Sequence, residues 1–139
     1  MGAHDASIDS ERVASLLDVL GGARLGELLR ILEARLSDVA AGLALRSIDP
    51  ALLGAIAHQA RGSASSLGLP VLAGRIGELE MLIDRSAAAI NDGRADAMAF
   101  IAAIDQVIAA QQAASAAIVA LFPELAAHYG TAAAGALKR

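Results

Sequence analysis

The chain has 139 residues and a formal net charge of −4, and 56% of its residues are hydrophobic while only 2% are aromatic. This length predicts one domain with a full core, and the absence of a basic block argues against nucleic acid as a partner. There is no cysteine, which excludes disulfides, thiolate nucleophiles and cysteine-based metal sites.

The apolar periodicity is helical along the whole chain. A short helix follows an N-cap at Asp9 or Ser10 and ends at Gly21-Gly22, after which a second helix begins. Asp49-Pro50 opens a third helix, because aspartate caps helices and proline suits the first helical position. Gly68-Leu69-Pro70 ends that helix and opens a fourth, and so short a link makes the two helices antiparallel.

Asn91-Asp92-Gly93 predicts a turn, and a long fifth helix follows from about residue 94 to residue 121, before Pro123. We therefore expect an all-α fold, an antiparallel four-helix bundle with a short extra N-terminal helix. The expected core residues lie on one face of each helix, most of them three or four positions apart: Val13, Leu16, Leu17 and Leu20, then Leu25, Leu28, Leu32, Leu36, Val39 and Leu43, then Leu52, Leu53, Ile56, Ala60, Ser63 and Leu67, then Leu72, Ile76, Leu79 and Ile83, and finally Ala97, Ile101, Ile104, Ile108, Gln111, Ser115 and Ile118.

Three regions follow from this pattern. Residues 1–7 are expected to be a disordered N-terminus, residues 8–122 the helical domain, and residues 123–139 a C-terminal tail that is poorly ordered or forms a short docking helix. No basic segment leads into an apolar one at the N-terminus. The uncharged stretch Gln106–Phe122 is shorter than the ~20 residues of a membrane span. We expect a cytoplasmic protein that does not bind a membrane.

One histidine, His58, stands out because the third helix directs it away from the core. At 100° per residue, His58 lies about 200° from Ile56, and Gly62 and Ser65 lie within about 40° of His58. Arg61 lies about 60° to one side. A glycine inside a helix costs ~1 kcal/mol relative to alanine, so Gly62 suggests that a partner must approach the imidazole closely. The alternative is an incidental surface histidine.

The segment from His58 to Gly68, His-Gln-Ala-Arg-Gly-Ser-Ala-Ser-Ser-Leu-Gly, resembles the signature of histidine phosphotransfer (HPt) domains. That signature is a histidine, two variable residues, lysine or arginine, glycine, small residues, and then a hydrophobic residue and glycine. The resemblance extends to the helix order over roughly residues 8–122. It implies that His58 accepts a phosphoryl group from an aspartyl phosphate on a receiver domain and passes it to another receiver in a phosphorelay. Arg61 departs slightly from the pattern, in which lysine is commoner.

The resemblance also implies a polar residue on the next helix, close to the imidazole. Glu80 stands at the matching place, at the margin of the apolar stripe. A carboxylate that accepts the Nδ1 proton of His58 would leave Nε2 as the nucleophile, and Arg61 would offset charge on the phosphoryl oxygens. His58, Arg61 and Glu80 are thus the predicted reactive set, and Gly62, Ser65 and Gly68 are predicted to give access for docking.

The resemblance implies a phosphocarrier that is not a free-standing enzyme. The sequence has no glycine-rich phosphate loop and no convincing acidic magnesium cluster. We therefore expect no cofactor on this chain, with the magnesium ion held by the receiver. The expected partners are response-regulator receiver domains, a hybrid histidine kinase, or both, and the expected state is a monomer.

Three other functions are compatible with a helical bundle. A non-catalytic adaptor would bind a partner and leave the histidine incidental. The phosphoacceptor region of a sensor kinase usually has an acidic residue beside its histidine and a proline soon after, whereas here Gln59 follows and the next proline is Pro70. A metal-binding bundle needs Glu-x-x-His pairs, and Ala55 stands three residues before His58.

Overall fold

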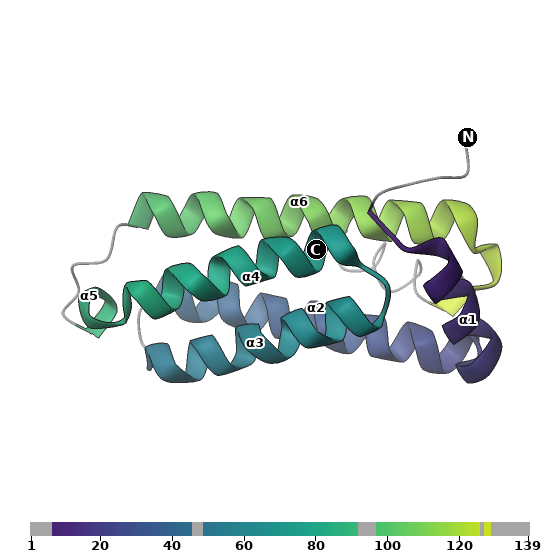
Figure 1. The fold of residues 1–139 in the computed structure, drawn as a ribbon, viewed down its shortest axis with the longest axis horizontal. Coiled ribbons are helices and arrows are strands. Elements are labelled where there is room, and N and C mark those ends of the chain that lie inside the picture. The colour runs from purple at the N-terminus through teal and green to yellow at the C-terminus, as the bar shows by residue number, and fades with distance from the viewer. Residues whose placement is uncertain (1–6, 46–48, 92–96, 126, 129–139) are drawn as a thin grey trace.

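The structure is a computed structural model that describes residues 7–45, 49–91, 97–125 and 127–128. Over these residues the chain is all-α, as predicted, and contains no strand. The helices are α1 (Ser10–Leu20), α2 (Gly22–Leu45), α3 (Pro50–Ser66), α4 (Pro70–Arg85), α5 (Ala87–Asn91) and α6 (Ala97–Leu121). Helices α2, α3, α4 and α6 run along the long axis, with α1 at one end and α5 at the other (Figure 1). The predictions for residues 1–6, for the turn at 92–93 and for 129–139 lie outside the described residues.

The predicted ends of α1 and α3 are confirmed by their capping contacts, whereas the predicted start of the last long helix, at about residue 94, lies outside the described residues. The side chain of Asp9 accepts a hydrogen bond from the backbone N–H of Arg12, and Asp49 accepts one from the N–H of Ala51. Gly21 and Gly68 follow α1 and α3 with φ of +81° and +82°, a left-handed conformation that favours glycine.

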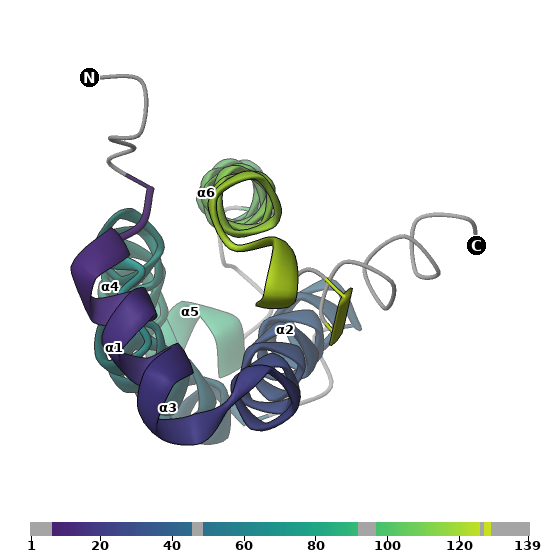
Figure 2. The ribbon, with the colours of Figure 1, turned by 90° about the vertical axis from the view of Figure 1, so that its right-hand side faces the viewer.

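Helix α1 lies across the turn between α3 and α4. The N–H of Asp9 donates to the carbonyl of Gly68 over 2.8 Å, and Nε of Arg12 donates to the carbonyl of Ser66 over 3.0 Å. The end-on view shows α1 extending over the ends of α4 and α3 (Figure 2). The short first helix therefore fastens the turn that sets α3 beside α4.

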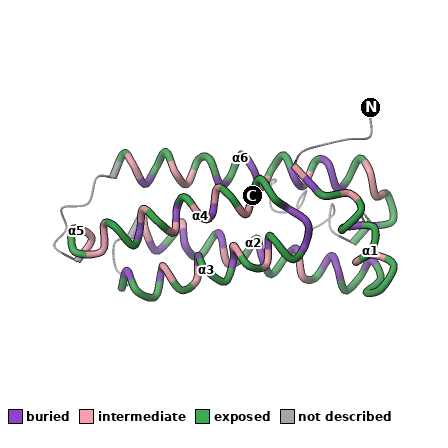
Figure 3. Tube along the Cα trace, in the orientation of Figure 1, coloured by how far each residue is buried: buried purple, intermediate pink, exposed green. Residues whose placement is uncertain are grey.

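The apolar core lies between the long helices. Helix α3 packs against α4 and α2, and α4 packs against α6. Buried segments alternate with exposed ones along each of them (Figure 3), as expected where one helical face is buried. The stripe predicted on α4 is confirmed, since Leu72, Ile76, Leu79 and Ile83 are all buried. On α2 the structure buries Leu25, Leu29, Leu32, Leu36 and Val39.

The core face of α3 differs from the prediction. Leu52 was expected in the core but is 53% exposed, and Ile56 is only partly buried. The buried residues of the helix are Pro50, Leu53, Ala57, Ala60 and Ala64. The core face is therefore turned by roughly 70° from Ile56, by the 100° helical step. The alanines explain the shift, because small side chains let α3 and α4 approach closely.

The predicted stripe on α6 is wrong at two of its large residues, since Ile101 and Ile108 are exposed. It is confirmed at Ile118, which is buried, and Ile104 is partly buried against the core. The buried residues of this helix are Phe100, Val107, Ala110, Ala114, Ala117 and Ile118. The helix is apolar on nearly all sides, with Asp105 its single charged residue, so periodicity does not distinguish one face from another. The segment Met98–Leu121 is long and apolar enough to cross a membrane, a test that core helices of soluble proteins also pass.

Two features lie beyond the long helices: a short helix that was not anticipated, and a segment after Pro123 that packs against α2, as in the second of the two alternatives expected for the C-terminal tail. The short helix α5 follows α4 directly after Ser86. After Pro123 the chain packs on α2: Leu125 is fully buried, and Nη1 of Arg30 donates to the carbonyl of His128 over 2.6 Å. The described start of the C-terminal tail is therefore part of the packed structure.

Candidate functional site

The candidate site lies on the seam between α3 and α4. His58 is near the middle of α3, and the tight turn after Ser66 folds α4 back along it. Glu80, twenty-two residues further along the chain, is thereby placed beside the imidazole. The buried face of α3, which is centred on its alanines, also determines the position of His58. It leaves the histidine side chain exposed, on the side of α3 that is next to α4. Sequence reasoning proposed this pair, and the structure brings it together.

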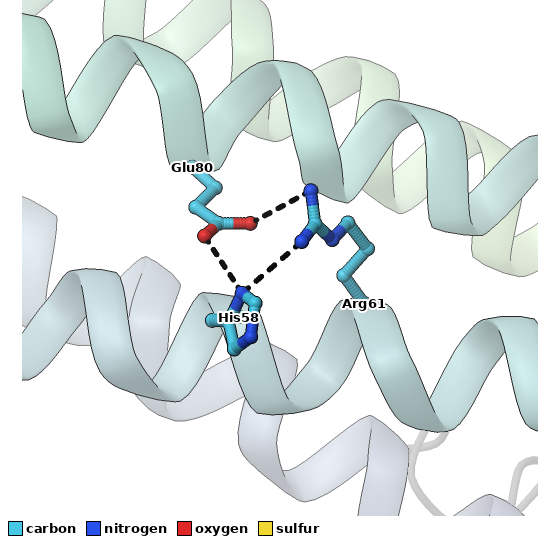
Figure 4. Close-up of polar contacts among 3 residues, drawn as sticks. All are labelled: His58, Arg61 and Glu80. Atoms are coloured by element: carbon cyan, nitrogen blue, oxygen red, sulfur yellow. Dashed lines mark hydrogen bonds and ion pairs between the residues drawn. The ribbon is translucent and has the colours of Figure 1, made fainter.

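The side chains of Glu80 and Arg61 both contact the same atom of the His58 imidazole, Nδ1 (Figure 4). Nδ1 of His58 lies 3.0 Å from Oε2 of Glu80 and 3.1 Å from Nη2 of Arg61. Nη1 of Arg61 lies 3.4 Å from Oε1 of Glu80. Oε1 is buried and accepts no hydrogen bond, so its contact with Arg61 is an ion pair whose geometry falls short of a hydrogen bond. The three residues form a closed triangle of contacts.

The exposure of the three side chains is graded. The His58 side chain is 63% exposed, that of Arg61 43% and that of Glu80 22%. The carboxylate thus lies between the helices while the imidazole projects into solvent. Because both polar contacts of the ring are made at Nδ1, this arrangement leaves Nε2 for a reaction partner.

Arg61 is oriented differently from the sequence-based expectation. The expected role was to offset charge on a phosphoryl group, but its guanidinium lies against Glu80 and Nδ1. Gly77 of α4 makes this possible, because a Cβ at that position would lie 3.3 Å from Cδ of Arg61. Sequence analysis did not single out Gly77. The available signal was a glycine in the interior of α4, three residues before the predicted site residue Glu80.

The predicted access residues have different environments. Gly62 is exposed, and a Cβ built there would meet nothing within 4 Å. Ser65 is exposed on the same helix, about 10 Å beyond His58 at 1.5 Å per residue. Gly68 is buried, and a Cβ there would lie 3.1 Å from Cγ of Arg12. Gly62 and Ser65 therefore share the open face of α3 with His58, whereas Gly68 belongs to the turn beneath α1.

A shallow groove between α2 and α3 adjoins this open face. Nη1 of Arg35 donates to the hydroxyl of Ser63 across it. Ile31, 39% exposed, contributes apolar surface, and Gln59 places the groove directly beside His58. The groove is lined by Leu28, Ile31, Arg35, Gln59, Gly62, Ser63, Ser66 and Leu67.

No known relative accounts for this geometry: no family model, no curated protein and no solved structure matches the chain. Among the residues that the structure describes, no group of three or more histidine or acidic side chains could hold a metal ion.

Proposed function

We propose that this protein is a histidine phosphotransfer protein, with the antiparallel four-helix bundle of that family and with His58 as phosphoacceptor. The observation that carries the proposal is an exposed imidazole whose Nδ1 lies 3.0 Å from the carboxylate of Glu80. The resemblance of the segment from His58 to Gly68 to the HPt signature supports it independently of the geometry.

The proposed reaction is transfer between an aspartyl phosphate and the imidazole. Nε2 attacks phosphorus, the bond between phosphorus and the aspartyl oxygen breaks, and the aspartate leaves as a carboxylate. The proton stays on Nδ1, where Glu80 accepts its hydrogen bond and balances the positive charge that develops on the ring. The aspartate and its magnesium ion belong to the receiver, so this chain supplies the nucleophile and its orientation.

The proposed docking surface is the open face of α3 together with the α2–α3 groove. Gly62 supports this choice, because its missing side chain leaves the backbone bare one turn after His58. The apolar side chains Leu28 and Ile31 supply contact area beside it. Receiver domains of response regulators or of a hybrid kinase are the proposed partners, with this protein as a cytoplasmic monomer.

The proposal is tested by incubating the protein with a receiver domain that carries a labelled aspartyl phosphate. We expect label on the protein that is lost in acid and retained in base, as phosphohistidine is, and we expect none on His58→Gln. The His128→Gln variant is the matched control, since this exposed histidine lies on the segment that packs against α2. Equal labelling of His58→Gln and the parent would refute the assignment.

A non-catalytic adaptor is the second candidate, and exposed apolar residues of α6 favour it. Met98 is 71% exposed, and Ile101, Ile108 and Val119 are each more than 40% exposed. Such a face is typical of a surface that binds a partner. An adaptor would bind its partner equally well after His58→Gln and would acquire no acid-labile phosphate.

A further inference from the structure

The triangle around Nδ1 contains a conflict that the proposed function leaves unexplained. Nδ1 can donate a hydrogen bond only when it is protonated and can accept one only when it is not. Glu80 offers an acceptor, which favours the tautomer with hydrogen on Nδ1. Arg61 offers a donor, which favours the tautomer with hydrogen on Nε2, and arginine stays protonated in proteins. Only one of the two contacts is a hydrogen bond at any moment.

We infer that Arg61 opposes Glu80 in setting the tautomer of His58, and that Gly77 is the positioning residue that holds Arg61 in this place. The inference rests on the proposed function, in which Nε2 is the nucleophile. With Arg61 donating to Nδ1, Nε2 carries the hydrogen and has no lone pair with which to attack. With Glu80 accepting from Nδ1–H, the lone pair is on Nε2. Arg61 therefore restrains the nucleophile, and Glu80 activates it.

The restraint is released by the phosphoryl donor as it approaches, before any bond to Nε2 forms. Phosphoryl oxygens attract a guanidinium strongly, so the phosphoryl group of a docked donor draws Arg61 away from Nδ1. Nε2 then gives its proton to water and Nδ1 takes one from water, an exchange that leaves the number of protons unchanged. The 63% exposure of the His58 side chain gives water access to the ring. The fraction of the resting imidazole with a lone pair on Nε2 is thus smaller before a phosphoryl donor arrives than after it.

Gly77 favours this arrangement because it leaves room for the arginine side chain. A Cβ at position 77 would lie 3.3 Å from Cδ and 3.9 Å from Nη1 of Arg61. A larger side chain would occupy the place of the guanidinium and turn it into solvent. Gly74, one turn earlier on α4, is the matched control, since a Cβ there would meet nothing within 4 Å.

The test is ¹⁵N NMR of the imidazole in the unphosphorylated full-length protein, which reports the ratio of the two tautomers of the neutral ring. Removing one charge-assisted hydrogen bond shifts this ratio by about tenfold. We expect Arg61→Ala to raise the fraction with hydrogen on Nδ1 and Glu80→Ala to lower it. Gly77→Leu should also raise the fraction with hydrogen on Nδ1, as Arg61→Ala does. Gly74→Leu should have the same tautomer ratio as the parent.

Shifts of the same sign in Arg61→Ala and Glu80→Ala, or an unchanged ratio in Arg61→Ala, would overturn the inference. Circular dichroism of each variant shows whether the helices are retained, and if Gly77→Leu does not fold, Arg61→Ala and Glu80→Ala decide alone. No receiver is present in this measurement. Opposite tautomer shifts in a protein that accepts no phosphoryl group would refute the proposed function and leave the tautomer control standing.

Discussion

Oε2 of Glu80 lies 3.0 Å from Nδ1 of His58, although the two residues are twenty-two positions apart and on different helices. The contact depends on the turn between α3 and α4, which α1 fastens through Asp9 and Arg12. A carboxylate in this place accepts the Nδ1 proton and directs the Nε2 lone pair outward. The contact itself, the access of a partner to His58 and the helix packing that positions both residues each lead to a testable prediction.

Replacing Glu80 by alanine should slow phosphotransfer by about a hundredfold, the low end for a positioned proton-binding group. The fold should remain, because a partly exposed ion pair contributes about 1 kcal/mol or less. Rapid-quench labelling measures the transfer rate, and circular dichroism checks the fold. The control is Glu78→Ala, which removes a carboxylate that pairs with Arg75 on the same helix. Unchanged transfer in Glu80→Ala would remove this carboxylate from the mechanism.

Replacing Gly62 by glutamine should weaken receiver binding without harming the helix. The added Cβ meets nothing within 4 Å, and glutamine in place of a helical glycine should raise the free energy of unfolding by about 0.5 kcal/mol. Titration calorimetry with a receiver measures affinity, and urea denaturation measures stability. Gly74→Gln is the control. It should gain the same stability and should bind the receiver with the affinity of the parent. If Gly62→Gln binds as the parent does, docking does not use this bare backbone.

Replacing Gly68 by alanine should lower the free energy of unfolding by about 2 kcal/mol or more, because its φ of +82° already costs an L-residue 1–2 kcal/mol. The new Cβ would also lie 3.1 Å from Cγ of Arg12 and 3.3 Å from the carbonyl of Asp9. Gly21→Ala is a comparison variant in which the φ is also positive, at +81°, and the added Cβ meets nothing within 4 Å. Its ψ of 161° lies in a region that only glycine adopts readily, so its backbone cost differs from that of Gly68. Urea denaturation measures both losses, and an unchanged free energy of unfolding in Gly68→Ala would show that α1 does not press on this turn.

The two adjacent leucines of α3 should respond very differently to truncation. Leu53 is 1% exposed and Leu52 is 53% exposed. Leu53→Ala should therefore cost 2–5 kcal/mol of unfolding free energy, roughly the range for buried leucines, and Leu52→Ala should cost about 1 kcal/mol or less. Thermal and urea denaturation give both values. The reverse order would contradict the observed core face, and equally large losses would match the face that the sequence pattern predicts, which contains both leucines.

Much of the candidate site could be predicted because its signals are local. His58, Arg61 and Gly62 share one helix, so their relative directions follow from the helical step alone. Glu80 was placed by its resemblance to a family position, and the structure brings it to the imidazole. Gly77 was missed because its importance depends on Arg61, a residue of another helix. Nothing within α4 indicates which side chain lies against it.

The sequence by itself determined that the chain is helical, and it determined both ends of α1 and α3 and the start of α4, because caps, prolines and glycines act on their own backbone. The end of α4 at Arg85 and the helix α5 carry no such signal and were not anticipated. The sequence also determined the buried stripe of α4, where large apolar residues contrast with charged ones. Only the tertiary structure decided which faces of α3 and α6 are buried. On α3 the small alanines, and on α6 the apolar residues on nearly every side, leave several faces similar in hydrophobicity, so the choice among them is made by the helices packed against them.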